Sequence, residues 1–323
     1  MMVSPHDYGR LAPPLPRRFT GPAALLLLGI TLATAPALAG KPTPFDTINA
    51  AAARSPITVK ALRGGVVMLA GSGGNIGVLP MPDGLLMVDT GIAVSEAQIK
   101  SVLRGISAKP LRTAILTHWH WDHSDGDAWV RRSGATIIAD AQTVARLKQT
   151  NTIVEWGHTF TPVAANSLPD LVLSDDKTLR SGRERIHIGH YRAGHTDGDL
   201  FVHFIRADVL QTGDTFWNGV YPFIDYVTGG SIDGAIRAAD QNLAIAGAGT
   251  LVIPGHGPVG NRADLIAFRD MLVAVRGKVA ALKAQGKSLP ETIAARPTAE
   301  FDAKWGQSII DGGLFTALVY RGV

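Results

Sequence analysis

A chain of 323 residues, 46% of them apolar, is long enough to bury a sizeable core in one large domain or two small ones. Lys and Arg exceed Asp and Glu by only 31 − 27 = 4, and no basic run suggests a surface that follows phosphates, which argues against a nucleic-acid-binding protein. The chain has no cysteine, which fits an oxidising compartment and excludes thiolate metal ligands.

Residues 1–39 have the pattern of an export signal. A basic stretch ends in two arginines at 17–18, an apolar stretch covers 23–32, and the sequence Ala-Leu-Ala stands at 37–39. We expect cleavage after Ala39 and a periplasmic or secreted protein, exported by the general or the twin-arginine route. The apolar stretch is shorter than the ~20 residues that a spanning helix needs, so no stable membrane span is expected once the signal is removed.

The next residues predict a short lead-in and then the folded body. Residues 40–56 are rich in Ala and Pro and are expected to form a loose N-terminal lead-in, with a single domain over 57–323. Short apolar runs separated by Gly- and Pro-containing turns predict consecutive strands at residues 66–70, 76–80 and 85–88. Ser95 then offers an N-cap to a helix that ends near residue 105.

Strands alternate with helices over the rest of the chain. Further strands are expected at residues 113–117, 136–139, 185–188, 200–205, 209–212 and 251–254. Further helices are expected at residues 127–132, 141–148, 232–246, 262–276 and 278–285. This alternation predicts the mixed α/β class, with sheets covered by helices.

The segment 117–123, Thr-His-Trp-His-Trp-Asp-His, is dense in potential metal ligands. It brings His118, His120, Asp122 and His123 together directly after an apolar, strand-like run. Imidazole nitrogen and carboxylate oxygen are the zinc ligands that a protein without thiols can offer. We therefore interpret the segment as part of a metal site, the alternative being a surface cluster of histidines.

Three later residues stand in similar positions. His195, Asp214 and His256 each follow a strand-like stretch, and each comes directly after a glycine that permits a sharp turn. Ligands in α/β sheets gather beyond the carboxyl ends of the strands. We therefore expect these residues and the segment 117–123 to form one cluster.

This order of residues resembles the ligand pattern of the metallo-β-lactamase superfamily of hydrolases. The resemblance covers most of residues 57–260 and includes two further motifs, Val-Asp-Thr-Gly at 88–91 and Gly-His-Thr-Asp-Gly at 194–198. It implies a four-layer αββα sandwich with a dinuclear zinc site at one edge. Iron or manganese would also accept these ligand types.

The resemblance also implies a role for each ligand. The residues that would hold the first zinc are His118, His120 and His195, those that would hold the second are Asp122, His123 and His256, and Asp214 would bridge the two. A water bound to zinc has a pKa near 7 and attacks as hydroxide, and Asp122 would orient it and pass on its proton. The implied activity is hydrolysis of an ester, thioester, lactone or amide bond in a small-molecule substrate.

The chain departs from the best-known lactamases at two positions. Those enzymes have Cys where this chain has Asp214, and a Lys three residues later, where this chain has Trp217. The aspartate is similar to that of the glyoxalase II branch, which leaves weak β-lactamase activity as one alternative function. A mononuclear iron enzyme similar to persulfide dioxygenases is a second, and a non-catalytic metal-binding carrier protein is a third. Nothing in the sequence names the substrate or the oligomeric state.

Residues beside the predicted ligands are candidates for supporting roles. Asn218 and Tyr221 follow Asp214 closely, and we expect them to donate hydrogen bonds to the substrate, the alternative being a packed turn. Asp225, further along, is an additional candidate. Asp89 is expected to bond loop backbone or a ligand histidine rather than a metal ion. The histidines expected to have structural roles are His187, His190 and His203.

Overall fold

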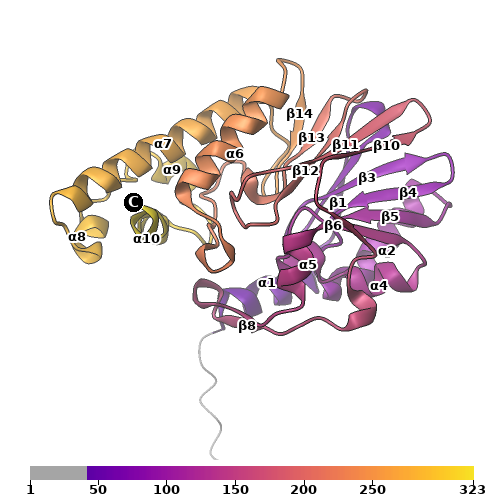
Figure 1. The fold of residues 1–323 in the computed structure, drawn as a ribbon, viewed down its shortest axis with the longest axis horizontal. Helices are drawn as coiled ribbons and strands as arrows, with labels where there is room; N and C mark the ends of the chain where they lie inside the picture. The colour runs from indigo at the N-terminus through magenta and orange to yellow at the C-terminus, as the bar shows by residue number, and fades with distance from the viewer. Residues whose placement is uncertain (1–41) are drawn as a thin grey trace, which may run out of the picture. The chain divides into compact units, whose positions relative to one another are not determined.

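Two β-sheets organise the part of the chain that the computed structural model describes, residues 42–323 (Figure 1). In spatial order, the larger sheet contains β1 (Thr58–Ala61), β2 (Val67–Ala70), β3 (Ile76–Met81), β4 (Gly84–Val88), β5 (Leu111–Ile115), β6 (Thr136–Asp140) and β9 (Leu171–Leu173). The smaller sheet contains β10 (Lys177–Ser181), β11 (Glu184–His190), β12 (Leu200–Phe204), β13 (Val209–Gln211) and β14 (Leu251–Ile253). A separate pair joins β7 (Asn151–Ile153) to β8 (His158–Phe160). The expected export signal lies outside the described residues.

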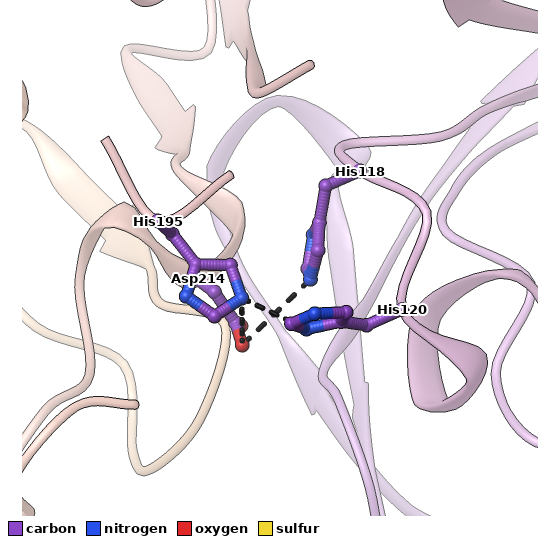
Figure 2. Close-up of side chains that lie close together, drawn as sticks. All are labelled: His118, His120, His195 and Asp214. Carbon is purple, nitrogen blue, oxygen red and sulfur yellow. Dashed lines mark hydrogen bonds and ion pairs between the residues drawn. The ribbon is translucent and has the colours of Figure 1, made fainter. Parts of the chain in front are cut away.

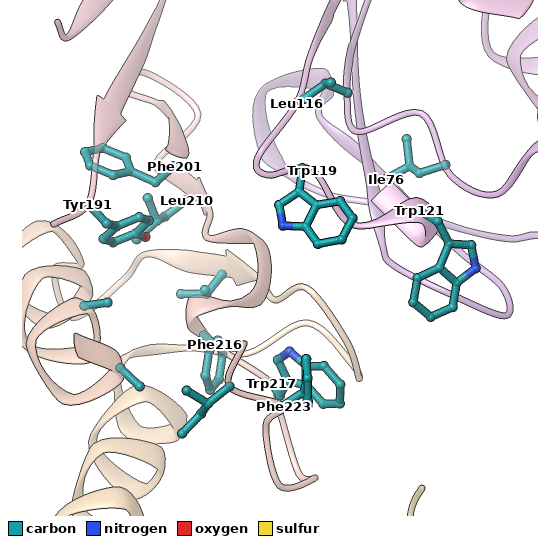
Figure 3. Packing of buried hydrophobic residues seen from close by; sticks show 14 of the residues in the cluster. Ile76, Leu116, Trp119, Trp121, Tyr191, Phe201, Leu210, Phe216, Trp217 and Phe223 are labelled. Carbon is teal, nitrogen blue, oxygen red and sulfur yellow. The ribbon is translucent and has the colours of Figure 1, made fainter. Parts of the chain in front are cut away.

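Side chains alternate between the two faces of each sheet, as the period of a strand requires. Leu86 of β4 and Val209 of β13 belong to one buried cluster, which lies between the two sheets. Their neighbours Leu85 and Leu210 belong to a second cluster on the outer faces, part of which is drawn in Figure 3. The central strands of each sheet are therefore buried on both faces, as in β4 and β13, and need a covering layer of helices.

Helices supply that covering. The outer face of the larger sheet carries α2 (Glu96–Ile106), α4 (Asp127–Arg132) and α5 (Ala141–Leu147), and that of the smaller sheet carries α6 (Ile232–Ile245) and α7 (Arg262–Ala284). The arrangement confirms the predicted four-layer αββα sandwich. The remaining helices are α1 (Pro44–Ala52), α3 (Trp121–Ser124), α8 (Leu289–Ala294), α9 (Asp302–Trp305) and α10 (Gly312–Gly322). Across residues 42–323, no helix has both the length and the apolar character to cross a membrane.

Strand direction determines where the polar loops meet. β4, β5 and β6 are parallel neighbours, and β13 is parallel to β14. Parallel neighbours end at the same edge of their sheet, so the loops that follow β4 and β5 lie together, as do those that follow β13 and β14. All of the residues that the sequence singled out as metal ligands, apart from His195, follow β5, β13 or β14.

Three local expectations need correction. The lead-in is not loose: α1 occupies most of it, with Thr43 and Asp46 in a capping box and Phe45 packed against the core. The helices expected at 262–276 and 278–285 are one helix, α7, because Val275 and Val279 are buried one turn apart on a common face that carries the helix across Gly277. Ser95 precedes α2 without capping it, since its hydroxyl donates to the carbonyl oxygen of Ala52 instead.

Candidate metal centre

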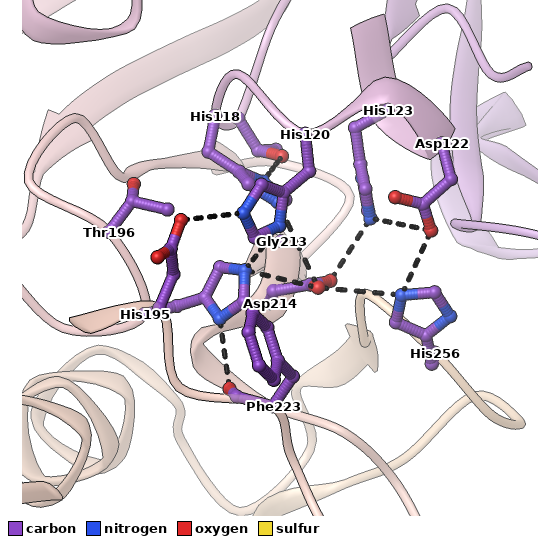
Figure 4. Close-up of polar contacts among 12 residues, drawn as sticks. His118, His120, Asp122, His123, His195, Thr196, Gly213, Asp214, Phe223 and His256 are labelled. Carbon is purple, nitrogen blue, oxygen red and sulfur yellow. Dashed lines mark hydrogen bonds and ion pairs between the residues drawn. The ribbon is translucent and has the colours of Figure 1, made fainter. Parts of the chain in front are cut away.

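The structure brings all seven predicted ligands into one cluster at the edge of the sandwich (Figure 4). They fall into two groups, within each of which the potential ligand atoms lie no more than 4.8 Å apart. The first group contains His118, His120, His195 and Asp214, and the second contains Asp122, His123 and His256. All are buried except His256, whose side chain is 19% exposed.

In the first group, three imidazoles converge on one carboxylate (Figure 2). Nε2 of His195 lies 3.4 Å from Oδ2 of Asp214 and 2.9 Å from Nδ1 of His120. Nε2 of His118 lies 3.8 Å from the same carboxylate oxygen. These contacts leave three ring nitrogens and one oxygen facing a common point, which is the donor set of a four-coordinate metal site.

Asp214 also reaches the second group. Its Oδ1 lies 3.1 Å from Nε2 of His123, and its Oδ2 lies 3.4 Å from Nε2 of His256. Asp122 completes this group, with Oδ2 at 3.4 Å from Nε2 of His256 and 3.8 Å from Nε2 of His123. One carboxylate therefore faces both groups, the arrangement expected if Asp214 bridges a pair of ions.

The donor atoms of the cluster are incompletely satisfied by the protein. Among the described residues, Nε2 of His118, His123 and His256 and Oδ1 of Asp214 are buried and make no hydrogen bond. Buried polar atoms are normally bonded, because an unmet donor or acceptor costs about 1–3 kcal/mol. Cations at the centre of the cluster would meet these atoms, so the residues present fit metal ions.

Hydrogen bonds to the ring nitrogens that point away from the cluster fix the orientation of two imidazoles, those of His123 and His118. Asp89 accepts hydrogen bonds from the backbone nitrogen and hydroxyl of Thr117 at 2.7 and 2.9 Å, and its Oδ2 lies 2.8 Å from Nδ1 of His123. The Thr117 hydroxyl in turn lies 3.1 Å from Nδ1 of His118. Asp89 thus bonds both a candidate ligand and loop backbone, and its carboxylate orients the ring of His123.

The sequence pattern did not assign the contacts behind the other two histidines of the first group. Oδ2 of Asp225 lies 3.0 Å from Nε2 of His120, and the backbone oxygen of Phe223 lies 3.0 Å from Nδ1 of His195. Asp199 accepts the backbone N–H of His195 at 2.7 Å. The sequence shows that Asp225 follows Asp214 closely, but the direction of the Asp225 side chain depends on the path of the loop between them.

Glycines allow the loops that carry the candidate ligands to approach one another closely. Gly213 has φ +53°, and a side chain there would collide with Thr117, whereas a side chain at Gly255 would collide with Oδ1 of Asp214. Asp89, directly after β4, also has a left-handed backbone, with φ +68°. Aspartate tolerates this conformation better than most residues. The glycine before Asp214 therefore serves both the turn and the approach of two loops.

Burial and neighbouring charges determine the protonation of the cluster. Burial, reinforced by His123, holds the pKa of His118 well below its usual value despite the opposing carboxylate of Asp214. Burial likewise lowers the pKa of His195 to about 4, again against the effect of Asp214. Both rings are therefore neutral at pH 7, the form that binds metal.

For Asp214, the charges of its neighbours outweigh the effect of burial on the pKa. Burial alone would raise the pKa of Asp214, but His256, His123 and His195 outweigh it and hold the pKa well below the ordinary value. Asp214 is therefore ionised at neutral pH. Metal binding to this side chain needs no loss of a proton there.

Tyr221 does not reach the cluster, which corrects the expectation for it. Its side chain is fully buried, and its hydroxyl lies 3.0 Å from Oδ1 of Asp302 and 3.2 Å from the backbone oxygen of Thr298. Its ring stacks on Phe315 at 4.6 Å. The phenol therefore fastens the C-terminal segment to the sandwich, as a packed loop residue would.

Asn218 also serves the loops rather than the cavity. Its side-chain amide donates to the carbonyl oxygen of Pro258 at 2.9 Å, and its backbone N–H donates to the carbonyl oxygen of His256 at 2.8 Å. These bonds support the position of His256. This bond uses one of the two N–H groups of the amide, and Asn218 is not among the residues that line the cavity beside the cluster, so its contact with a substrate stays a prediction.

The three histidines expected to be structural lie outside the seven-residue cluster. His187 and His190, both on β11, lie 3.6 and 2.9 Å from the carboxylate of Asp176. His203 is on the neighbouring strand, β12.

A cavity of about 580 Å³ opens beside the cluster. His120, Asp122, Asp214 and His256 contribute to its lining. Most of the other lining side chains are apolar, and they come from distant parts of the chain, including α1, the β1–β2 hairpin and residues 308–309. A mostly apolar cleft with a few convergent polar groups is the usual form of a small-molecule site.

Comparison with known proteins agrees with this geometry. Residues 70–259 match the family model described as the metallo-beta-lactamase superfamily. A metallo-beta-lactamase from Pontibacter korlensis is 18% identical, with 67% of this chain and 99% of that one covered and a TM-score of 0.55. The sec-alkylsulfatase Pisa1 from Pseudomonas sp. is 16% identical over 86% of this chain and 52% of that one, with a TM-score of 0.61. The DIM-1 metallo-beta-lactamase is 19% identical over 68% of this chain and 97% of that one, with a TM-score of 0.52. Because the family model matches more than half of its length, the chain belongs to the metallo-beta-lactamase superfamily.

Proposed function

We propose that the protein is a hydrolase that depends on two zinc ions and cleaves an ester, thioester, lactone or amide bond in a small molecule. The observation that carries the proposal is the carboxylate of Asp214, which faces both groups and lies within 3.8 Å of the Nε2 atoms of His118, His123 and His256, none of which has a hydrogen bond within residues 42–323. Bound divalent ions at such a site would polarise the substrate and lower the pKa of a coordinated water to about 7.

The chain's own residues would perform the remaining tasks. Asp122 lines the cleft, and it faces the two histidines of its group, His123 and His256, through Oδ2 only. We therefore assign to Asp122 the orientation of the attacking water and the transfer of its proton. The apolar walls of the cleft exclude water around the scissile bond, which strengthens the electrostatic interactions there. The contacts from Asp89 and Asp225 hold the imidazoles in place before substrate arrives.

Metal analysis together with a substrate panel tests this proposal. Zinc-loaded protein and the Asp122→Asn variant would be assayed on aryl esters, thioesters, lactones and amides, with a β-lactam and a secondary alkyl sulfate as further members of the panel. We expect turnover in the parent, and a variant that retains zinc but loses turnover by about 10²-fold or more. Equal turnover in both proteins would contradict the role of Asp122. Iron with oxygen uptake on a persulfide, or silence across the panel, would reject the hydrolase.

The proposed location is the periplasm or the extracellular medium. This proposal is based on the signal pattern at residues 1–39. Expression of the full chain with its own N-terminus, followed by fractionation and mass spectrometry, is expected to find a mature chain that begins at Gly40. Full-length chain confined to the cytoplasm would contradict this.

A further inference from the structure

One face of the β1–β2 hairpin overhangs the cleft. Thr58 pairs with Ala70, and Lys60 pairs with Met68. Since side chains two residues apart share a face of a strand, these four side chains point the same way, and all four line the cavity of about 580 Å³. Lys60 is exposed as well as part of the lining, so its side chain is accessible from both the cavity and the solvent.

Of the charged side chains that line this cavity, the acids belong to the candidate metal cluster and the lysine does not. Lys60 is the one Lys or Arg in the lining, and it makes no ion pair with any residue between 42 and 323. The lining has two acids, Asp122 and Asp214, and both belong to the metal-ligand cluster. With those carboxylates facing cations, no acidic side chain of the lining remains to neutralise the lysine.

Most of the remaining wall is apolar. It includes Ile48, Met68, Trp156, Trp217, Val220 and Ile309. An anion that passes along such a wall loses hydration and gains little from it, so the ammonium group of Lys60 is the group of the lining outside the metal cluster that could compensate a negative charge.

We infer that the substrate is a mostly apolar molecule with an anionic group remote from the scissile bond, and that Lys60 binds this group. The inference rests on the proposed function for the position of the scissile bond.

The alternative role of Lys60 is structural, because a lysine on an edge strand discourages pairing with other chains. Lys177, on β10 at the edge of the smaller sheet, shares that position but does not line the cavity. It is therefore the matched control.

A binding measurement tests the inference without hydrolysis. Titration calorimetry would compare ω-phenoxyalkanesulfonates with ω-phenoxyalkanols of equal chain length on the zinc-loaded protein, because these ethers cannot be hydrolysed and sulfonate is a weak metal ligand. We expect the parent and Lys177→Gln to prefer the anion, and Lys60→Gln to lose about two- to fivefold in affinity for the anion alone. Equal binding of the two ethers by the parent, or a preference that survives Lys60→Gln, would overturn the inference.

Kinetics separate this inference from the proposed function. Matched 4-nitrophenyl esters with a neutral or a sulfonated acyl end would be compared in the parent and in Lys60→Glu. We expect the ratio of kcat/KM for the anionic ester to kcat/KM for the neutral ester to fall in the variant, and added salt to weaken the preference of the parent for the anionic ester. Hydrolysis of both esters without preference overturns the role of Lys60 alone. Failure to hydrolyse either ester or any member of the substrate panel, with the binding preference intact, overturns the proposed function alone.

Discussion

Oδ2 of Asp225 lies 3.0 Å from Nε2 of His120, and the opposite ring nitrogen of that histidine lies 2.9 Å from His195. The carboxylate therefore determines which nitrogen of His120 faces the cluster. Burial would raise the pKa of Asp225, but the hydrogen bond and charge of His120 outweigh it and the pKa is lowered, so the carboxylate is ionised at neutral pH. An ionised acceptor fixes the proton of His120 on Nε2 and frees Nδ1 to bind a metal ion.

The first prediction concerns this contact. Asp225→Asn replaces an obligatory acceptor by an amide that can also donate, so the ring of His120 loses its fixed orientation. We expect zinc affinity to fall about 10- to 100-fold, as measured by competition with a chromophoric chelator. Asp83→Asn, at an exposed turn between β3 and β4, is the control and should match the parent. Unchanged zinc affinity in Asp225→Asn would show that the contact does not position His120.

The two groups should lose metal independently. His256→Ala removes a donor of the second group, and His195→Ala removes one of the first. We expect each variant to bind about one zinc per chain, against about two in the parent, because in each case the other group keeps its donors. Mass spectrometry of the folded protein under native conditions measures this ratio. His187→Gln, on β11 outside the cluster, should retain the full content, and a parent that binds a single ion would contradict the two-site arrangement.

Removal of Phe45 should loosen the N-terminal helix. The ring stacks on His158 with 3.6 Å between centroids and lies 5.3 Å from the ring of Trp121. Because Phe45 is half-buried, we expect Phe45→Ala to lower the free energy of unfolding by about 1–3 kcal/mol, measured by urea denaturation. An exposed α1 position gives the control, Thr47→Ala. Equal stability of both variants would mean that α1 is held elsewhere.

Tyr221→Phe distinguishes a structural phenol from a substrate contact. Loss of the hydroxyl removes the hydrogen bond to Asp302 or Thr298, and we expect a loss of about 1–2 kcal/mol in stability. We also expect kcat and KM to stay at the values of the parent, because the hydroxyl does not line the cleft. A lower kcat at unchanged stability would return Tyr221 to the active site.

Asp127 should make stability depend on pH. Burial holds the pKa of its carboxyl well above the usual 3.8, only partly offset by the hydrogen bond to Thr90. The folded state therefore binds this proton more tightly than the unfolded state. Its stabilising effect is complete below about pH 4 and is lost as the pH rises through the folded pKa.

Asp127→Asn tests that linkage. The amide oxygen can still accept the hydrogen bond from the Thr90 hydroxyl, which lies 2.9 Å from Oδ1 in the parent. We expect the stability of the variant relative to the parent to increase with pH, as measured by urea unfolding in a series of buffers after treatment with chelator. A difference that stays constant with pH would show that Asp127 ionises normally.

The clustering of the candidate metal ligands was the most predictable feature of the molecule, for a physical reason. Apolar runs that end in a polar residue mark the ends of buried strands, and parallel strands bring such ends to one edge. Asp214 after β13 and His256 after β14 follow this rule within the smaller sheet, whereas the approach of His118, which follows β5 of the larger sheet, also depends on how the two sheets pack.

Contacts that depend on loop direction could not be predicted in the same way. Tyr221 turns away from the cluster because the segment 298–302 offers a carbonyl oxygen and a carboxylate to its hydroxyl. Nothing near Tyr221 in the sequence indicates that partner. The helix α1 is hard to predict because its residues resemble a linker, although the capping pair Thr43 and Asp46 is a sequence signal for its start.

Several residues that line the cleft come from parts of the chain that lie outside the stretch containing the candidate metal ligands. Thr58 and Lys60 precede the segment that matches the family, residues 70–259, and Ser308 and Ile309 follow it, whereas every donor of the metal cluster lies inside it. Part of the cleft wall is thus encoded outside the segment that carries the seven candidate ligands. A mutant library confined to the flanking positions would retune selectivity without disturbing metal loading, which makes this scaffold suited to directed evolution.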